Sequence, residues 1–219
     1  YLPASLLTER LKALLRLEPE NLRQLLLDLQ MEKRLVLRHA PNDADETRVY
    51  LANYDRMELH VAAMLKELDI RETAGHTRAE EQLALLEEEE AGLVLDETQR
   101  RAVLAAVQSG LLVITGGPGT GKTTTINAII RCFEAEGAEI LLAAPTGRAA
   151  ARMTEATGRE AKTIHRLLEV TGAPTGDEEG DTGRESWSTV RFDRNKEQPL
   201  EADCIIIDEM SMVDLRLFH

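Results

Sequence analysis

The chain has 219 residues, of which 43% are hydrophobic and 30% are charged, and its formal net charge at pH 7 is −13. This length allows one large domain or two smaller ones, and the acidic balance argues against a basic surface covering a whole nucleic-acid-binding domain, although a local basic groove stays open. No apolar run reaches the roughly 18 residues of a membrane helix and no signal-peptide pattern opens the chain, so we expect a soluble, cytoplasmic protein without a membrane partner.

Residues 1–70 form the first predicted module. Leucines at helical spacing predict an amphipathic helix over residues 6–15, and Pro19 stands where the first turn of a second leucine-rich helix is expected. Two β-prone segments, residues 35–39 and 48–51, flank a turn-rich spacer and predict a hairpin. Helices followed by a β-hairpin resemble a winged helix, a relative of the helix-turn-helix modules used on DNA.

The charge of this module argues for a structural or partner-binding role over DNA contact. Its second helix is acidic and offers only Arg23, Lys33 and Arg34 to phosphates. Two further helices are predicted over residues 53–70 and 76–91, and they connect the module to the rest of the chain.

A glycine-rich loop at residues 116–121 is followed by Lys122 and Thr123, in the pattern Gly-x-x-x-x-Gly-Lys-[Ser/Thr]. Glycines let successive backbone N–H groups turn into one concavity around an anion. Lys122 adds a positive charge, Thr123 offers a hydroxyl to Mg²⁺, and the helix that starts there points its positive end at the phosphates. We therefore expect ATP or GTP to bind here.

The segments around the loop support this interpretation. Residues 111–115 are apolar and β-branched and predict a buried parallel strand, and residues 123–136 predict a helix with one apolar face. Strand, loop and helix then follow in the order that a phosphate-binding loop requires. Cys132 and Cys204 lack metal-ligand spacing and stand in apolar patterns, which indicates buried free thiols.

Strands and helices alternate beyond the loop. We predict a strand at residues 139–144, a helix at 148–157, a short helix at 163–170 and a strand at 204–208. This alternation predicts an α/β fold with a parallel, doubly wound sheet. Basic side chains recur in this half, as expected for a nucleic-acid strand near the site: Arg148, Arg152, Arg159, Lys162 and Arg166.

Residues 171–201 are rich in Gly, Asp and Ser and predict a surface loop or hairpin. We expect Trp187, Val190 and Phe192 to anchor this segment, with stacking on bases as the alternative.

The predicted strand at 204–208 ends in two carboxylates, Asp208 and Glu209. Asp208 is placed to hold Mg²⁺, directly or through water, and Glu209 to accept a proton from the water that attacks the γ-phosphate. A solvated strand end would also carry such residues, but the phosphate loop upstream favours an ATPase site.

Gln99 allows two interpretations. Its amide carries a donor and an acceptor and is able to read the edge of adenine. Asp96 and Gln99 also have the spacing of a capping-box variant, and local structure alone favours this second interpretation.

Several motifs in a fixed order carry a family resemblance. Gln99 precedes GGPGTGKTTT, and APTGRAA at residues 144–150, TIHRLL at 163–168 and DEMSM at 208–212 follow. Residues 93–215 resemble the RecD-like branch of superfamily 1 DNA helicases, and the leading module is similar to that of the stand-alone RecD-like helicases more than to the exodeoxyribonuclease V alpha subunit. The resemblance implies a winged-helix-like module at residues 1–70, a connecting helix at 71–92 and a first RecA-like P-loop NTPase motor domain at 93–219.

The resemblance also implies a role for each matching residue. Gln99 would contact adenine, Lys122 the β- and γ-phosphates, Thr123 and Asp208 the magnesium ion, and Glu209 the hydrolytic water. The nucleotide would be held by Gln99, Gly117, Pro118, Gly119, Thr120, Gly121, Lys122, Thr123 and Thr124. The backbone of single-stranded DNA would be held by Pro145, Thr146, Gly147, Arg148, Thr163, His165 and Arg166. Without the resemblance, His165 reads as an ordinary helix-start residue and Arg148 as a solvated one.

The family moves 5′ to 3′ along single-stranded DNA as ATP closes a cleft between two RecA-like domains, in DNA repair and recombination. The sequence stops within a predicted helix at residues 213–219 and before the motifs of a second motor domain, so we expect a truncated, monomeric chain that binds nucleotide weakly. An arginine finger contributes about 10³ to 10⁵ in rate, so we expect almost no turnover from these residues alone. Other repair proteins are candidate partners.

Two rival functions remain open at this point. One is an ATPase that remodels a protein or gates another enzyme. Arg148 and residues 163–168 argue against it. The other is a winged-helix adaptor that binds DNA or a partner and carries a degenerate nucleotide-binding fold. The intact Lys122, Asp208 and Glu209 argue against it.

Overall fold

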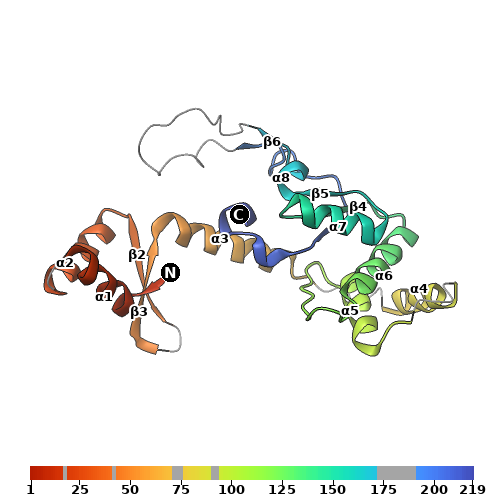
Figure 1. Ribbon diagram of the computed structural model, residues 1–219, viewed down its shortest axis with the longest axis horizontal. Coiled ribbons are helices and arrows are strands. Elements are labelled where there is room, and N and C mark those ends of the chain that lie inside the picture. The colour runs from red at the N-terminus through yellow and green to blue at the C-terminus, as the bar shows by residue number, and fades with distance from the viewer. Residues whose placement is uncertain (17–18, 41–42, 71–75, 90–93, 172–190) are drawn as a thin grey trace. The chain divides into compact units, whose positions relative to one another are not determined.

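The computed structural model describes residues 1–16, 19–40, 43–70, 76–89, 94–171 and 191–219 (Figure 1). The chain divides into two compact units, Tyr1–Glu67 with Asp214–His219 and Leu68–Val213. No helix of the described ranges is both long and apolar enough to cross a membrane.

The first unit is a small antiparallel sheet with helices. Its strands pair in the order β1-β3-β2, and β2 runs antiparallel to β3 from Leu35↔Leu51 to His39↔Thr47. The predicted pair of helices and the hairpin are confirmed, but the second strand is longer than predicted, because β3 begins at Asp43 within the expected turn-rich spacer. Its elements are β1 (Leu2–Pro3), α1 (Ala4–Leu15), α2 (Pro19–Met31), β2 (Leu35–Ala40), β3 (Asp43–Leu51), α3 (Ala52–Leu68) and α9 (Leu215–Phe218).

Leucines of α2 form the interior of this unit. Leu22 is fully buried and Leu26 nearly so, one helical turn apart, and Val49 of β3 is buried as well. The buried carboxylate of Asp55 on α3 accepts two hydrogen bonds from Arg38 on β2, at 2.7 and 2.8 Å. This bidentate pair joins the start of α3 to the sheet and raises the pKa of Arg38.

The second unit is a mixed α/β structure with a parallel sheet. The sheet has the order β5-β4-β8, with β4 parallel to both neighbours. The elements of this unit are α4 (His76–Glu89), α5 (Glu97–Gln108), α6 (Lys122–Ala135), β4 (Ile140–Ala144), α7 (Gly147–Thr157), β5 (Ala161–Thr163), α8 (Ile164–Leu167), β6 (Val170–Thr171), β7 (Arg191–Phe192), β8 (Cys204–Ile207) and the 3₁₀ turn η1 (Met210–Met212).

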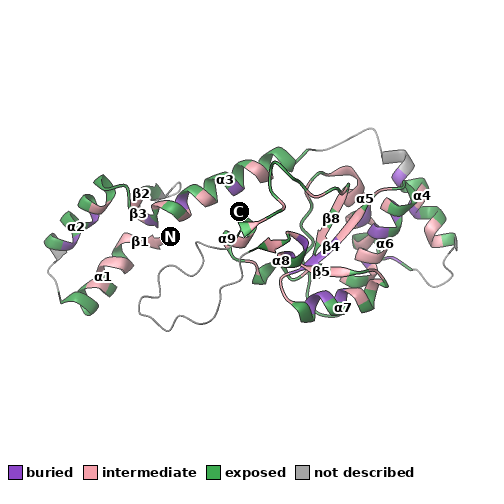
Figure 2. Cartoon of the chain, turned by 90° about the horizontal axis from the view of Figure 1, so that it is seen from above, coloured by how far each residue is buried: buried purple, intermediate pink, exposed green. Residues whose placement is uncertain are grey.

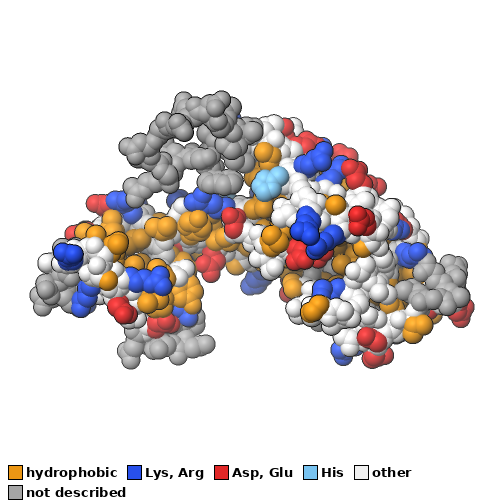
Figure 3. All heavy atoms as spheres, in the orientation of Figure 1, with side chains coloured by type: hydrophobic (Ala, Val, Ile, Leu, Met, Phe, Trp, Pro, Cys, Tyr) orange, Lys and Arg blue, Asp and Glu red, His pale blue; other side chains and the backbone are white. Residues whose placement is uncertain are grey.

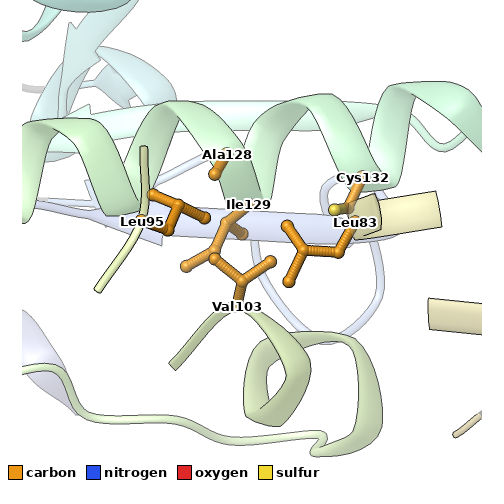
Figure 4. Close-up of a cluster of buried hydrophobic side chains, with 6 residues drawn as sticks. All are labelled: Leu83, Leu95, Val103, Ala128, Ile129 and Cys132. Carbon is orange, nitrogen blue, oxygen red and sulfur yellow. The ribbon is translucent and has the colours of Figure 1, made fainter. Parts of the chain in front are cut away.

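The hydrophobic core of this unit joins α4, α5 and α6. Figure 4 shows one cluster: Leu83, Leu95, Val103, Ala128, Ile129 and Cys132. A second cluster of Ile130, Leu142 and Met153 joins α6, β4 and α7. Buried positions accordingly concentrate on the inner sides of α6, α7 and β4 (Figure 2).

The prediction of a strand at residues 111–115 is wrong. The segment has no regular structure, Val113 is 80% exposed, and β8 pairs with β4 alone among the described strands. The physical reason is that β-propensity measures how a side chain packs against neighbouring strands, and here the run lies in no ladder. Its amino-terminal end is held elsewhere, since Gly110 donates its N–H to the Ile70 carbonyl at 2.8 Å.

One further prediction is corrected in detail, and another is confirmed. The helix predicted at residues 163–170 is shorter, because β5 leads into α8 and β6 follows it. For residues 171–201, the antiparallel pair of β6 and β7 forms the base of a hairpin, with Val170 opposite Phe192. Phe192 is half-buried, whereas Trp187 and Val190 lie outside the described residues.

The two cysteines are free, as predicted, but only Cys132 is fully buried. Burial raises the pKa of the Cys132 thiol to about 11, and the charge of Glu136 adds to the shift. Cys204 is half-buried, and desolvation raises its pKa as well.

We predict that native Cys132 resists thiol reagents. Because its pKa is about 11, only about one molecule in a thousand carries the thiolate at pH 8. In a Cys204→Ser variant, reaction with a disulfide reagent should be slow in buffer, accelerate as the pH rises towards 11, and become fast in denaturant. Equal rates in buffer and denaturant would contradict the burial of Cys132.

Gly110→Ala should destabilise the protein. A Cβ at this position would stand 2.2 Å from the carbonyl oxygen of Leu68, so the backbone must shift, at a cost of about 1–3 kcal/mol. The measurement is the free energy of unfolding in urea. Gly147→Ala is the matched control, since a Cβ there meets nothing within 4 Å, and it should leave stability unchanged or raise it.

Candidate nucleotide-binding site

The glycine-rich loop leads directly into α6, a 14-residue helix of the core. Gly119 and Gly121 adopt positive φ angles of 75° and 73°, and Gly121 is the N-cap of α6. A left-handed backbone is strained for other residues, which explains glycine at these two turns. No side chain of the described residues caps α6, so its first N–H groups are available to an anion.

Lys122 is half-buried and bends back over the loop. Its Nζ donates hydrogen bonds to the carbonyls of Gly116 and Gly117, both at 2.7 Å. The loop is further closed by the Thr120 hydroxyl, which donates to the Gly117 carbonyl at 2.9 Å. The ammonium group therefore lies inside the loop, where an incoming phosphate would meet it.

Asp208 follows the carboxyl end of β8. Its backbone N–H donates to the Ala143 carbonyl at 3.0 Å, which continues the β4–β8 ladder by one residue. Its Oδ1 accepts a hydrogen bond from the N–H of Glu209 at 2.8 Å. Glu209 itself is exposed and has a φ of 54°, an uncommon conformation for a non-glycine residue.

The structure brings Lys122 and Asp208 to one pocket. This pocket has a volume of about 530 Å³ and lies among α6, residues 106–114 and β8. Thr123 and Glu209 are not among its described lining residues. The loop lysine and the acidic strand end thus share a cavity although 86 positions separate them in the chain.

The Asp208 carboxylate suits Mg²⁺ that is held mainly by water and by the phosphates of a substrate. Among the described residues, no group of three His, Cys, Asp or Glu side chains is placed to hold a metal. Mg²⁺ commonly binds through one or two protein oxygens, several waters and substrate phosphates. One oxygen of Asp208 accepts a hydrogen bond from Glu209, and the other accepts none from the residues that the structure describes.

Gln99 forms the predicted capping box. The Asp96 Oδ1 accepts from the N–H groups of Thr98 and Gln99 at 2.8 and 2.9 Å, and Gln99 Oε1 accepts from the N–H of Asp96 at 2.9 Å. Gln99 Nε2 also donates to the Thr120 carbonyl at 3.4 Å, a contact that sequence reasoning missed. The position of Gln99 in the first turn of a helix gave no sequence signal for this backbone acceptor.

The residues predicted to bind DNA gather at the carboxyl edge of the sheet. In the register, Ala144 pairs with Thr163 and Ala143 with Ile207, so the segments that follow these strands start at one edge. Thr146 caps α7 by accepting from the Ala149 N–H. Thr163 caps α8 by accepting from the Arg166 N–H.

The basic residues of this half have different environments. Arg159 is engaged by Glu134, and the pair lowers the pKa of Glu134. Within the described part of the chain, Arg148 and Arg166 are exposed and lack an ion pair. His165 is half-buried and its ring centroid lies 6.2 Å from that of Phe192. On the face shown in Figure 3, basic and acidic side chains are interspersed. This distribution fits a few local contacts with nucleic acid and does not fit a continuous basic surface.

A glycine-rich loop at the start of a helix, whose lysine shares a pocket with the acidic end of a parallel strand, defines the class of phosphate-loop nucleotide-binding domains. The family described as an AAA domain matches residues 99–219. The chain therefore belongs to this family.

Individual relatives confirm the RecD-like resemblance over part of the chain. The ATP-dependent RecD2 DNA helicase of Deinococcus radiodurans is 34% identical over 168 residues, which cover 77% of this chain and 21% of that protein. The RecBCD enzyme subunit RecD of Mycobacterium tuberculosis is 39% identical over 145 residues, covering 55% and 22%. The ATP-dependent DNA helicase dda of Enterobacteria phage T4 is 39% identical over 110 residues, covering 49% and 22%. The chain spans about a fifth of the length of these curated relatives.

Asp96→Ala should destabilise α5. Loss of its carboxylate leaves two N–H groups of the first turn without a partner, at a cost of about 1 kcal/mol. The measurement is the free energy of unfolding, compared with Glu97→Ala, which removes an acid from the same turn without removing the cap. An equal effect of the two substitutions would show that charge, not capping, stabilises the helix.

Proposed function

We propose that this chain is part of an ATP-dependent DNA helicase of the RecD-like type. ATP hydrolysis at the loop would drive 5′ to 3′ movement along single-stranded DNA, in DNA repair or recombination. The observation that carries the proposal is the shared pocket of Lys122 and Asp208, because a triphosphate with its metal needs a phosphate-binding loop and a carboxylate at one place.

We assign the roles from the chemistry of each side chain. Lys122 and the loop amides would bind the β- and γ-phosphates. Thr123 and Asp208 would hold the magnesium ion, which would neutralise charge on the phosphate oxygens. Glu209 accepts the proton of the attacking water. Its exposed carboxylate and its place directly after Asp208 support this role.

The DNA strand would lie along the carboxyl edge of β4 and β5. Pro145, Thr146, Gly147 and Arg148 follow β4, and Thr163, His165 and Arg166 follow or end β5. Exposed backbone at helix starts and two cations without ion pairs among the described residues suit phosphates, which are bound without regard to base sequence.

The first unit supports a kinship with the stand-alone helicases. Similarity to the Deinococcus RecD2 helicase covers 77% of this chain, against 55% for the mycobacterial RecD subunit. We propose that this unit is a winged-helix-like module that serves in packing or partner binding. We also propose that the chain is a monomer.

Lys122→Ala should lower the affinity for ATP at least tenfold. The substitution removes the cation that meets the phosphates inside the loop. Equilibrium binding of a fluorescent ATP analogue with Mg²⁺ measures this, with Lys196→Ala as the control that removes an exposed lysine elsewhere. Unchanged binding would remove the basis for the proposed ATPase.

Arg148→Ala should weaken binding of single-stranded DNA several-fold and reduce its salt dependence by about one counterion. Fluorescence anisotropy of a labelled oligonucleotide over a salt series measures both, and Arg101→Ala on α5 is the matched control. If Arg148→Ala leaves DNA binding unchanged while Lys122→Ala abolishes ATP binding, the protein-remodelling ATPase becomes the better interpretation.

A further inference from the structure

Three basic side chains line a second pocket in the α/β unit. Lys162 of β5, Arg166 of α8 and Arg194, which follows β7, reach it from three segments of the chain. Its volume is about 250 Å³. None of the three is among the described residues that line the pocket of Lys122 and Asp208, so this is a separate site. The rest of its described lining is Leu141, Leu167, Leu200, Glu169 and Glu201.

The main chain fixes the backbone of each cation. Lys162 lies within the parallel ladder of β4 and β5, and Thr163 caps α8 by accepting from the Arg166 N–H. The N–H of Arg194 donates to the Leu168 carbonyl at 3.2 Å, which ties the segment after β7 to the end of α8. An anion that enters the pocket therefore has only side chains to order, which lowers the entropic cost of binding.

The guanidinium group of Arg194 is only partly satisfied. Its Nη2 donates to Glu169 Oε1 at 2.9 Å, whereas its Nε is buried and has no hydrogen-bond partner among the described residues. Lys162 and Arg166 are exposed, and neither has an ion pair within the described ranges. Because a buried N–H without a partner is costly, it points to an acceptor from outside these residues.

The charges that line the pocket favour an anion. Three cations are set against two carboxylates, and one of these, Glu169, is already paired with Arg194. Guanidinium and ammonium groups are the usual donors to phosphate, whose oxygens accept from several of them at once. One water takes up about 30 Å³ in the liquid, so the pocket has room for a phosphate group with water around it.

The position of the pocket indicates which phosphate binds. Arg166 belongs both to this pocket and to the residues proposed to hold DNA at the carboxyl edge, and Lys162 directly precedes Thr163 of the same group. A strand held at that edge would present its next phosphate to the pocket at a high effective concentration. A free anion would have only the small net charge of the pocket to attract it.

We infer that Lys162, Arg166 and Arg194 together bind a backbone phosphate of single-stranded DNA. The inference rests on the proposed DNA-binding function, and it extends the path of the strand from the carboxyl edge to the segment after β7. Because a phosphate contact does not read bases, the pocket contributes equally for every base sequence.

The first test changes the charge of the pocket in both directions. With Lys162→Gln, affinity for labelled oligo-dT and for a mixed-sequence oligonucleotide should fall alike, about 3- to 10-fold. The slope of log affinity against log salt concentration should fall by about 0.7. Glu201→Gln removes an acid from the pocket and should raise the affinity about twofold. Lys196→Gln is the matched control, since Lys196 is exposed and does not line the pocket.

The second test locates the phosphate on the protein. Lysines are acetylated with N-hydroxysuccinimidyl acetate and read by mass spectrometry, in the presence and absence of the oligonucleotide. Single-stranded DNA should protect Lys162 and leave Lys196 equally reactive. ATP with Mg²⁺ should not protect Lys162, because the nucleotide would occupy the other pocket.

The outcomes separate the inference from the function on which it rests. If Lys162→Gln binds DNA as Lys196→Gln does while Arg148→Ala weakens binding, the inference is overturned and the proposed function stands. Protection of Lys162 by ATP and not by DNA would assign the pocket to a free phosphate compound. Protection by neither would favour an acidic protein partner, and both results overturn the inference. If the wild-type chain binds no single-stranded DNA, the inference and the proposed function fall together.

Discussion

The parallel pairing of β4 with its two neighbours is the constraint on which the site depends. Parallel strands end at the same edge, so the register Ala144↔Thr163 and Ala143↔Ile207 places three connections side by side. One connection carries Arg148, another carries Arg166, and the third carries Asp208. A different strand order would separate these side chains even if the residues themselves stayed the same.

The packing of α6 supplies the other half of the site. Ile129 faces α5 and Ile130 faces β4 and α7, so the helix is held from two sides. Because Lys122 is its first residue, burial of the helix body fixes the position of the loop. The free N–H groups at its start and the bent Lys122 side chain then form one electropositive turn beside Asp208.

Local signals in the sequence were sufficient where one element decides its own structure. The capping box at Asp96 and Gln99, the helix that begins at the glycine-rich loop and the hairpin of the first unit all formed as predicted. Residues 111–115 did not form a strand, because an apolar run needs a neighbouring strand to pair with. The two-residue strand β1 is too short to show a repeating pattern, so sequence reasoning missed it, whereas the turn-rich composition of residues 171–201 indicated the hairpin that β6 and β7 begin and end.

By itself the sequence determined the family, the phosphate-binding loop and the chemical types of the site residues, since these rest on residue identity and short spacings. Only the tertiary structure decided that Lys122 and Asp208 share a pocket, that Arg159 is engaged by Glu134, and that both ends of the Gln99 amide are bound. Each of these depends on a contact between residues far apart in the chain or on a backbone acceptor. Such contacts are set by how helices and strands pack, which no local pattern encodes.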